Sequence, residues 1–434
     1  ITGADGDANQ TLSALELSNV ETISVNNFAT GSGTHIIDGA LSTGLTSVGL
    51  NASSAAGDTS FTNMVNFVDV FMKSGNASLT VAYGATVNAG VSDVQNVTLT
   101  GVTNSTTNLT IAGVETVNIT TSGLKSTVNN LAFDAATTLN ISGDQNLTVA
   151  GAVPATAGTI DASGLTGKLS MTANPTPASA SLTGGSNNDV ITITAGKLTS
   201  TTTYDGGAGV DTLVLLAAAD WNVLTYGNAT NFEVLGAGVR ETFDFSKLDG
   251  GVAVLSAAAN GTNSVTFSNM PSSSTGTITG TEGMDLLLAQ DSASDDATIT
   301  IGSATAAGLT IGDPIALAEY ETVTINSSSI SDNNINIESG QMTSLTVAGS
   351  QGITISVSNA STLKVIDGSG IIDAAGTGLT IDENPSVAAA GGVTITGTDF
   401  GLDNLLGGAG GDTISGGGVA DSLSGAGGAD TLNG

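Results

Sequence analysis

Four aspartates near the end of the chain follow one another at intervals of nine residues, and each precedes a large aliphatic residue by two positions. Glycines gather before each aspartate, so the segment repeats the pattern G-G-x-G-x-D-x-U-x, in which U is aliphatic. Calcium prefers carboxylate and carbonyl oxygens as ligands, and glycine allows the backbone to approach an ion closely. The spacing therefore predicts calcium-binding turns. The expected ligands are the carboxylates of Asp403, Asp412, Asp421 and Asp430 and the carbonyls of Gly408, Gly410, Gly417 and Gly427.

The copies differ in how closely they follow the pattern. Segment 407–415 matches at every position, 416–424 carries Val419 and Ala420, and 425–433 has Ala426 in place of the second glycine. With a period of nine, we expect each aspartate to stack on the aspartate of the next nonapeptide and each aliphatic residue to stack likewise. The ions would then lie between successive turns. A column of carboxylates repels itself without a cation, so folding and calcium binding are expected to be one event.

Single copies of the nonapeptide also occur inside the chain. Segments 184–192 and 206–214 are in phase, the second directly after Asp205, whereas 280–288 is a degenerate copy. An isolated copy lacks an obvious neighbour to complete a calcium shell, so these are weaker evidence than the terminal array. Two further aspartates, in the sequences DASG and DGSG, stand in similar turns. The additional candidate ligands are Asp189, Asp205, Asp211 and Asp285, followed by Asp161 and Asp367.

Short alternating runs of β-branched residues predict the elements that position these turns. The motif V-E-T opens such runs at 20–23 and 114–117, and a variant occurs at 320–323. Turn-forming Gly, Asn, Ser and Asp residues separate the runs. Recurring strand motifs of similar sequence favour an all-β, right-handed parallel β-solenoid or β-roll over a sandwich. The glutamate of V-E-T is expected to cap a turn or to bond a neighbouring backbone, and the alternative is a role in calcium binding. Segments 217–224 and 313–319 are candidates for short helices or 3₁₀ turns and could equally be loops.

The strand motifs and nonapeptides divide the chain into four expected segments. They are a β-solenoid region at 1–183, an internal calcium segment at 184–215, a second β-solenoid region at 216–396 and the nonapeptide array at 397–434. The chain does not begin with methionine and ends inside the array, so we expect it to be a piece of a longer polypeptide.

Composition excludes several classes of function. The net charge is −32, with 39 acidic and 7 basic residues, which argues against nucleic-acid binding. The absence of an 18-residue apolar run argues against membrane insertion. Cysteine is absent, and the single histidine, His35, has no visible catalytic partners. The sequence thus predicts no enzyme and no cofactor other than Ca²⁺.

The chain resembles the RTX-type surface-layer (S-layer) proteins of Gram-negative bacteria. The resemblance rests on VETVNI at 114–119, TTLNISGD at 137–144, the glycine-rich segment 184–213, NFEVL at 231–235, EYETVTI at 319–325 and the terminal array. It implies type I secretion, a calcium-dependent solenoid and self-assembly into a homo-oligomeric lattice on the extracellular cell surface. In such proteins a helical N-terminal domain binds lipopolysaccharide, and this chain shows no such domain.

Two other functions remain open on the sequence alone, because secreted adhesins and hydrolases share the nonapeptide. The chain could be part of an RTX adhesin or biofilm-matrix filament, or stalk, whose binding modules lie elsewhere. It could also be the calcium-binding portion of a type I-secreted hydrolase with a separate catalytic domain.

Overall fold

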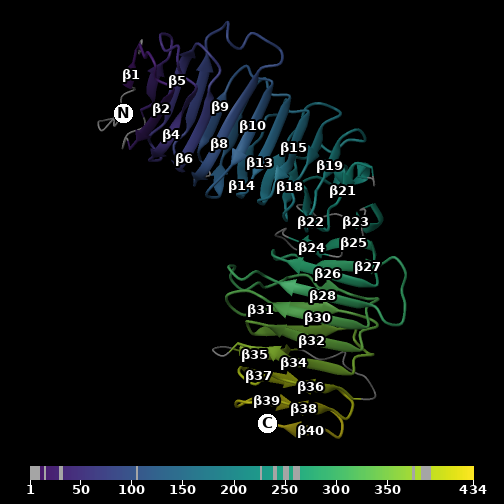
Figure 1. The fold of residues 1–434 in the computed structure, drawn as a ribbon. Helices are drawn as coiled ribbons and strands as arrows, with labels where there is room; N and C mark the ends of the chain where they lie inside the picture. Colours follow the sequence, from purple (N-terminus) through teal and green to yellow (C-terminus); the bar gives the residue numbers. More distant parts are fainter. Residues whose placement is uncertain are drawn as a thin grey trace. The chain divides into compact units, whose positions relative to one another are not determined.

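A computed structural model shows the chain as the stacked coils of a parallel β-solenoid with almost no helix, about 17 turns in all (Figure 1). This confirms the all-β solenoid predicted from the alternating runs. The structure describes residues 10–13, 16–28, 33–103, 106–224, 227–237, 242–247, 254–257, 264–373, 377–382 and 392–434. The chain forms two compact units, the first comprising 1–214 and 222–232 and the second comprising 215–221 and 233–434.

The first unit contains strands of three sheets, each named here by its first strand. The β1 sheet has the order β1 (Gln10–Leu12), β3 (His35–Asp38), β5 (Thr59–Met64), β7 (Leu79–Tyr83), β9 (Asn108–Ile111) and β12 (Asn130–Ala132). The β2 sheet has the order β2 (Thr22–Asn27), β4 (Ser47–Ser53), β6 (Asp69–Gly75), β8 (Val94–Val102), β10 (Thr116–Thr121), β13 (Thr138–Gly143), β15 (Thr159–Leu165), β17 (Ser181–Thr183), β19 (Thr203–Asp205) and β21 (Ala229–Thr230). The β11 sheet has the order β11 (Ser126–Val128), β14 (Leu147–Ala152), β16 (Leu169–Ala173), β18 (Val190–Ile193) and β20 (Thr212–Leu215).

The second unit contains strands of two sheets and one short 3₁₀ helix, and the residues of one short α-helix are divided between the two units. The β22 sheet has the order β22 (Val234–Ala237), β24 (Val254–Ala257), β26 (Ser273–Ile278), β28 (Asp296–Ile301), β30 (Thr322–Ser327), β32 (Ser344–Gly349), β34 (Val365–Ile371), β36 (Thr394–Thr396), β38 (Thr413–Ser415) and β40 (Thr431–Asn433). The β23 sheet has the order β23 (Thr242–Asp244), β25 (Val265–Met270), β27 (Met284–Leu288), β29 (Ile315–Ala316), β31 (Asn333–Glu338), β33 (Ile353–Ser358), β35 (Thr377–Asp382), β37 (Leu402–Leu406) and β39 (Ser422–Ser424). The helices are α1 (Ala218–Val223) and η1 (Phe245–Lys247).

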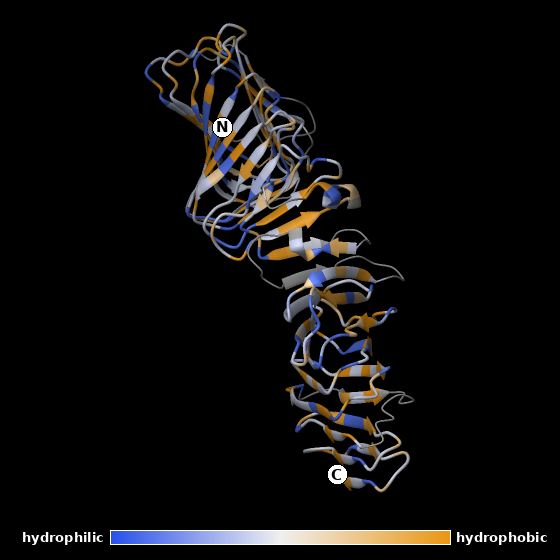
Figure 2. Ribbon diagram, turned by 90° about the vertical axis from the view of Figure 1, so that its right-hand side faces the viewer, coloured by the Kyte–Doolittle hydropathy of each residue, from blue (hydrophilic) through white to orange (hydrophobic). Residues whose placement is uncertain are grey.

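Alternation along each strand builds the core. In the β22 sheet, Ile299, Ile325 and Val347 pair in register on successive strands and are fully buried, whereas the residues before and after each of them on its strand face outward. Figure 2 shows this alternation of hydrophobic and hydrophilic residues along many strands. Because successive side chains of a strand point to opposite faces, each coil stacks its aliphatic residues on those of the next coil.

Polar side chains form a matching ladder on the outside of the first unit. Asn96, Asn118 and Asn140 occupy equivalent positions on β8, β10 and β13, and their amides bond one another at 3.0 and 2.8 Å. Successive members lie 22 residues apart, which is the length of one coil here. Such bonds fix the register of neighbouring coils from outside while the aliphatic column fixes it from inside.

Two of the V-E-T glutamates bond a neighbouring backbone, as predicted. The Glu115 carboxylate accepts a 2.9 Å hydrogen bond from the backbone N–H of Asp93, and Glu321 accepts one of 2.8 Å from Asp295. Each bond joins one coil to the coil before it. Of the two candidate helices, the one at 217–224 is present as α1, whereas 313–319 is the alternative, a loop with the short strand β29. Ile315 in that segment instead pairs with Ile337 of the β23 sheet, because it supplies an inward side chain to the core.

Candidate calcium-binding turns

Consecutive nonapeptides of the terminal array lie on two different sheets. Strands β37 and β39 belong to the β23 sheet, whereas β38 and β40 belong to the β22 sheet. One nonapeptide therefore supplies half a coil, and the residues that stack on each other are 18 apart in sequence. The expectation that each aspartate stacks on the next one, nine residues on, is wrong. The structure forms two columns, in which Asp403 stacks with Asp421 and Asp412 with Asp430.

The aliphatic residues follow the same half-coil rule. Leu405 pairs with Leu423 across β37 and β39, and Ile414 pairs with Leu432 across β38 and β40. Leu405 and Ile414 are fully buried. The aliphatic residues of these two repeats thus point inward, as predicted, whereas Leu432 on the last strand is 47% exposed.

Asp412 shows how a carboxylate is held in these columns. Its Oδ1 accepts a hydrogen bond of 2.7 Å from the N–H of Val393, one coil earlier, and its Oδ2 accepts one of 2.6 Å from the N–H of Gly408 in its own turn. Its own N–H donates to Asp430 Oδ1 at 2.9 Å. A single carboxylate therefore ties its own glycine turn to the preceding coil.

Asp403 repeats this arrangement in the other column. Its two oxygens accept bonds of 2.5 Å from the N–H of Leu379 and 2.6 Å from the N–H of Thr398, and its N–H donates to Asp421 Oδ1 at 3.1 Å. The Oδ2 atom of Asp421 is buried and has no hydrogen-bond partner among the described residues. A buried carboxylate oxygen without a donor is costly, and a cation would satisfy it.

The first glycine of each nonapeptide packs directly against its aspartate. A Cβ atom at Gly407, Gly416 or Gly425 would collide with the Oδ2 atom of the aspartate five residues later. These glycines therefore create the space in which the carboxylate lies. The sequence contains them as the leading glycine of each repeat, but the contact with the carboxylate does not follow from the turn-forming property of glycine alone.

The glycines whose carbonyls were predicted as calcium ligands lie in the same turns. Gly417 has a φ of +110°, which explains the need for glycine there, and the Gly408 carbonyl accepts a 2.9 Å bond from the N–H of Gly427. A Cβ at Gly428 would collide with the Gly410 carbonyl oxygen, so the chain passes close to that oxygen. Ala426, which replaces a glycine, takes the left-handed φ of +61°, a strained conformation for a residue with a side chain.

The two internal copies that are in phase, 184–192 and 206–214, stack on each other. Asp189 Oδ1 and Oδ2 accept bonds from the N–H groups of Leu169 at 2.7 Å and Gly185 at 2.6 Å, and the Asp189 N–H donates to Asp211 Oδ1 at 2.6 Å. Both aspartates are fully buried. Segments 184–192 and 206–214 thus form a column like those of the array, with a spacing of 22 residues. The view that each copy is isolated is wrong, because one coil separates them.

Two candidates bond differently. Asp205 Oδ1 accepts bonds from the N–H of Gly207 at 3.0 Å and from the side-chain amide of Asn231 at 2.7 Å. Asp285 faces outward on β27 and accepts a 3.1 Å bond from the hydroxyl of Thr266. The structure therefore does not place either carboxylate in a column of the Asp412 type.

The two weaker candidates lie at strand bulges. Asp161 Oδ1 accepts a 2.9 Å bond from the N–H of Ser163, and Asp367 Oδ1 accepts a 3.0 Å bond from the N–H of Ser369. The register of β15 and of β34 shifts at these turns. Each carboxylate closes its own local turn, and hydrogen bonds from the Ser163 side chain and then from its N–H lower the pKa of Asp161.

Burial controls the electrostatics of the columns. Desolvation raises the pKa of Asp403 most strongly, the N–H donors of Thr398 and Leu379 lower it, and the charge of Asp421 raises it again. Desolvation likewise raises the pKa of Asp189. These carboxylates thus hold protons more readily in the fold than in water, and a divalent cation would offset both the burial and the repulsion between like charges.

These pKa shifts predict how the calcium-free protein responds to pH. A carboxyl with a raised folded pKa binds more protons in the folded state, so its contribution to stability is present below the unfolded pKa of about 3.9 and is lost as pH rises through the folded pKa. Without calcium, stability is expected to fall as pH rises above about 4. Urea unfolding in a chelator across this range measures it. Asp403→Asn should flatten the dependence, and an equal rise in stability with pH in both proteins would contradict it.

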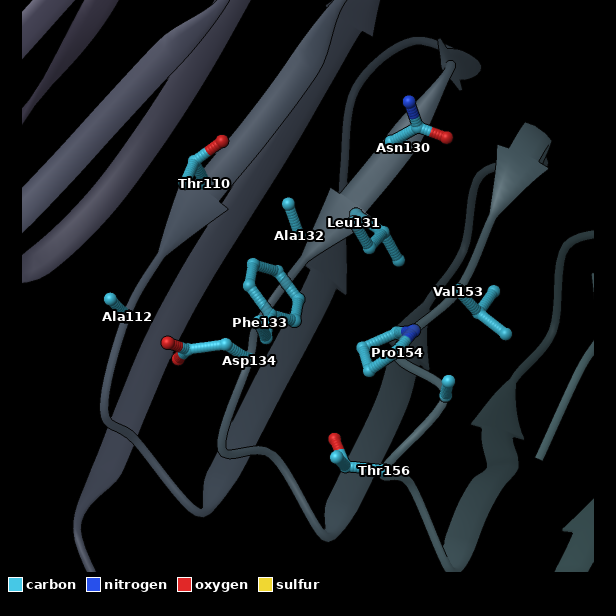
Figure 3. Close-up of a pocket in the computed structure, with 11 residues that line it drawn as sticks. Thr110, Ala112, Asn130, Leu131, Ala132, Phe133, Asp134, Val153, Pro154 and Thr156 are labelled. Atoms are coloured by element: carbon cyan, nitrogen blue, oxygen red, sulfur yellow. The ribbon is translucent and has the colours of Figure 1, made fainter. Parts of the chain in front are cut away.

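An apolar groove lies beside β12, the last strand of the β1 sheet. Figure 3 shows Leu131 and Phe133 on one side and Val153 and Pro154 on the other. Its volume is about 520 Å³ and its lining is mainly apolar. Pro154 has no N–H to donate to a neighbouring strand, so the sheet ends there and the groove opens. Asp134 at the rim accepts a 2.8 Å bond from the N–H of Gly113.

Within the described ranges, no three His, Asp or Glu side chains gather into a group that could hold a metal ion, and no helix has the length and hydrophobicity of a membrane span. Comparisons of the whole sequence with protein-family models and with curated proteins gave no match.

Proposed function

We propose that this chain is a structural part of a calcium-dependent bacterial surface layer, in which the glycine-rich turns bind Ca²⁺. The stacked aspartate columns are the observation that carries the proposal. In three columns a carboxylate lies against a glycine turn, and one column ends in the buried, unpartnered Oδ2 of Asp421. Calcium suits such sites because it accepts several oxygen ligands in a flexible shell.

The charge of the chain supports a role for calcium in assembly. A net charge of −32 makes copies repel one another, and divalent cations between acidic faces would reduce that repulsion. Extracellular calcium modules commonly bind with dissociation constants of about 10⁻⁴–10⁻³ M. Calcium sites of that strength fill outside the cell and stay empty inside it. Assembly would then begin after secretion by a type I route.

The proposed partner is the chain itself, in a two-dimensional lattice on the cell surface. Attachment to lipopolysaccharide would require a domain outside this chain. The proposed role is structural rather than enzymatic, and the aspartate columns supply rigidity: each carboxylate joins two coils, so calcium at these sites would stiffen the stack coil by coil.

Electron microscopy of the purified protein at matched concentration, with calcium and with chelator, tests this proposal. Ordered sheets or tubes that form only with calcium are expected. Folded single particles in calcium would contradict the lattice and favour the adhesin or filament stalk. Calcium-independent folding and assembly would contradict the calcium role itself.

A further inference from the structure

The mouth of the apolar groove beside β12 is lined by small side chains. Leu131, Phe133 and Val153 belong to its lining but are almost fully buried, whereas Ala112 and Ala132, on neighbouring coils, are exposed (Figure 3). The groove volume of about 520 Å³ is within the range of about 300–1,000 Å³ that is usual for ligand pockets. The groove therefore has room for large apolar side chains from another molecule.

This groove carries little charge, although the net charge of the chain is −32. Of its 11 lining residues only Asp134 is ionisable, and its carboxylate lies at the rim. An apolar side chain that enters displaces water without burying a charge. The groove thus favours an apolar occupant, and an acidic molecule can approach it with little repulsion.

The second unit exposes two large apolar side chains at one edge. Phe400 lies in the turn before β37 and is 54% exposed, and Leu402 begins β37 and is 60% exposed. Ile372, in the turn between β34 and β35 at the same edge, is 65% exposed. Exposed apolar side chains that gather in this way are typical of interaction sites. Phe400 and Leu402 are called the apolar ridge below.

The calcium pattern does not require the ridge. Phe400 and Leu402 fill the third and fifth positions of the repeat 398–406, which the pattern G-G-x-G-x-D-x-U-x leaves open. In the three repeats that follow, the same positions hold only small residues: Ala409, Gly411, Gly418, Ala420, Gly427 and Ala429. Both ridge side chains are exposed, so the core does not require them either. Their presence in this one repeat therefore indicates a contact with another molecule.

We propose that the apolar ridge of one copy of this chain inserts into the groove of a second copy. Every copy carries both features, and a heterologous contact of this kind adds further copies unless it closes into a ring. The inference rests on the proposed self-assembly and assigns one place where copies meet. Exposed Asp399, beside Phe400, would approach Asp134 at the groove rim, so calcium between them would reduce their repulsion.

The contact is small and acts through repetition. The exposed half of the Phe400 side chain offers about 75–125 Å², whereas a stable interface buries about 800 Å² on each partner. One such contact holds two copies only weakly, but a copy that uses its groove and its ridge at once is held twice. Detection in solution therefore needs a covalent trap.

Cross-linking between introduced cysteines tests this inference, because the native chain has no cysteine. Ala132→Cys places a thiol in the groove, and Asn404→Cys places one on the outward face of β37, two residues after Leu402. One variant carries a mass tag. With calcium and a short thiol-reactive cross-linker, the mixed variants are expected to form mixed dimers. Each variant alone, and the mixture in chelator, are expected to form none.

Two further substitutions in the Asn404→Cys chain test the ridge itself. Phe400→Ser is expected to abolish the mixed dimer. Ile330→Ser is the matched control, since Ile330 is 61% exposed outside the ridge, and it should leave the yield unchanged. Thermal unfolding in calcium accompanies both. If Phe400→Ser unfolds early, a ring in the groove replaces it: Ala132→Phe, with the groove thiol moved to Ala112→Cys, should also abolish the mixed dimer.

The absence of mixed dimers overturns the inference, as do mixed dimers that persist after Phe400→Ser or Ala132→Phe. Equal yields from unmixed variants also overturn it, because they would mean that like surfaces meet. Electron microscopy of the same samples separates this result from the proposed function. Calcium-dependent sheets without mixed dimers keep the surface layer and reject this contact, whereas mixed dimers in filaments or free pairs keep the contact and reject the two-dimensional lattice.

Discussion

Asp412→Ala is expected to weaken calcium binding and to unfold the terminal array at calcium concentrations where the native protein stays folded. The substitution removes the acceptor for the N–H groups of Val393 and Gly408, which are buried at a coil boundary. Each unsatisfied buried donor costs about 1–3 kcal/mol. It also removes a proposed calcium ligand, and loss of bound calcium reduces the stability that binding adds to the fold.

Calorimetric calcium titration and thermal unfolding, each with calcium and with chelator, measure the effect of Asp412→Ala. Asp296→Ala is the matched control, because it removes the same charge from an exposed position whose carboxylate only accepts a bond from the Ser273 hydroxyl. The variant should lose calcium stoichiometry and melt early, whereas the control should do neither. Unchanged stoichiometry and thermal stability in Asp412→Ala would argue against a calcium role for this column.

The fold followed from the sequence because its signal is local. Alternating β-branched runs specify strands with one buried face, and repetition of V-E-T specifies stacking of like on like. The hydrogen bonds of Glu115 and Glu321 show why that motif recurs, since each joins a coil to its predecessor. The conformation of segment 313–319 was not predictable from the sequence, because its apolar residues have no clear period. The pairing of β29 with β31 decides it.

The glycine- and aspartate-rich turns were predictable from their pattern, but the residues that stack on them were not. Period nine gives the repeat along the chain, whereas stacking depends on how many residues complete a coil, and the array needs two nonapeptides for that. The contact between Asp189 and Asp211 was not predictable for the same reason, because neither nonapeptide alone shows the 22-residue coil that brings them together. Asp205 and Asp285 match the composition of such turns, yet Asp205 accepts bonds from the Gly207 N–H and the Asn231 side-chain amide, and Asp285 accepts one from the Thr266 hydroxyl.

Ile325→Ala is expected to destabilise the second unit by about 2–5 kcal/mol, because it empties a fully buried position. Ile325 stacks between Ile299 and Val347. A solenoid coil contacts only its neighbours, so the resulting cavity weakens two interfaces at once and no distant packing compensates. Thr324→Ala on the same strand leaves the core intact and should cost less than about 1 kcal/mol.

Urea unfolding at one fixed calcium concentration compares these two variants, since free calcium itself changes the apparent stability of a protein that binds it. The difference between the variants isolates the aliphatic column from the strand propensity that both substitutions alter. Equal losses in both would mean that the outer face, rather than the inner column, sets the stability of the coil. That result would also change the expectation for Asp412→Ala, because the carboxylate columns and the aliphatic columns run through the same coils and share the task of holding them in register.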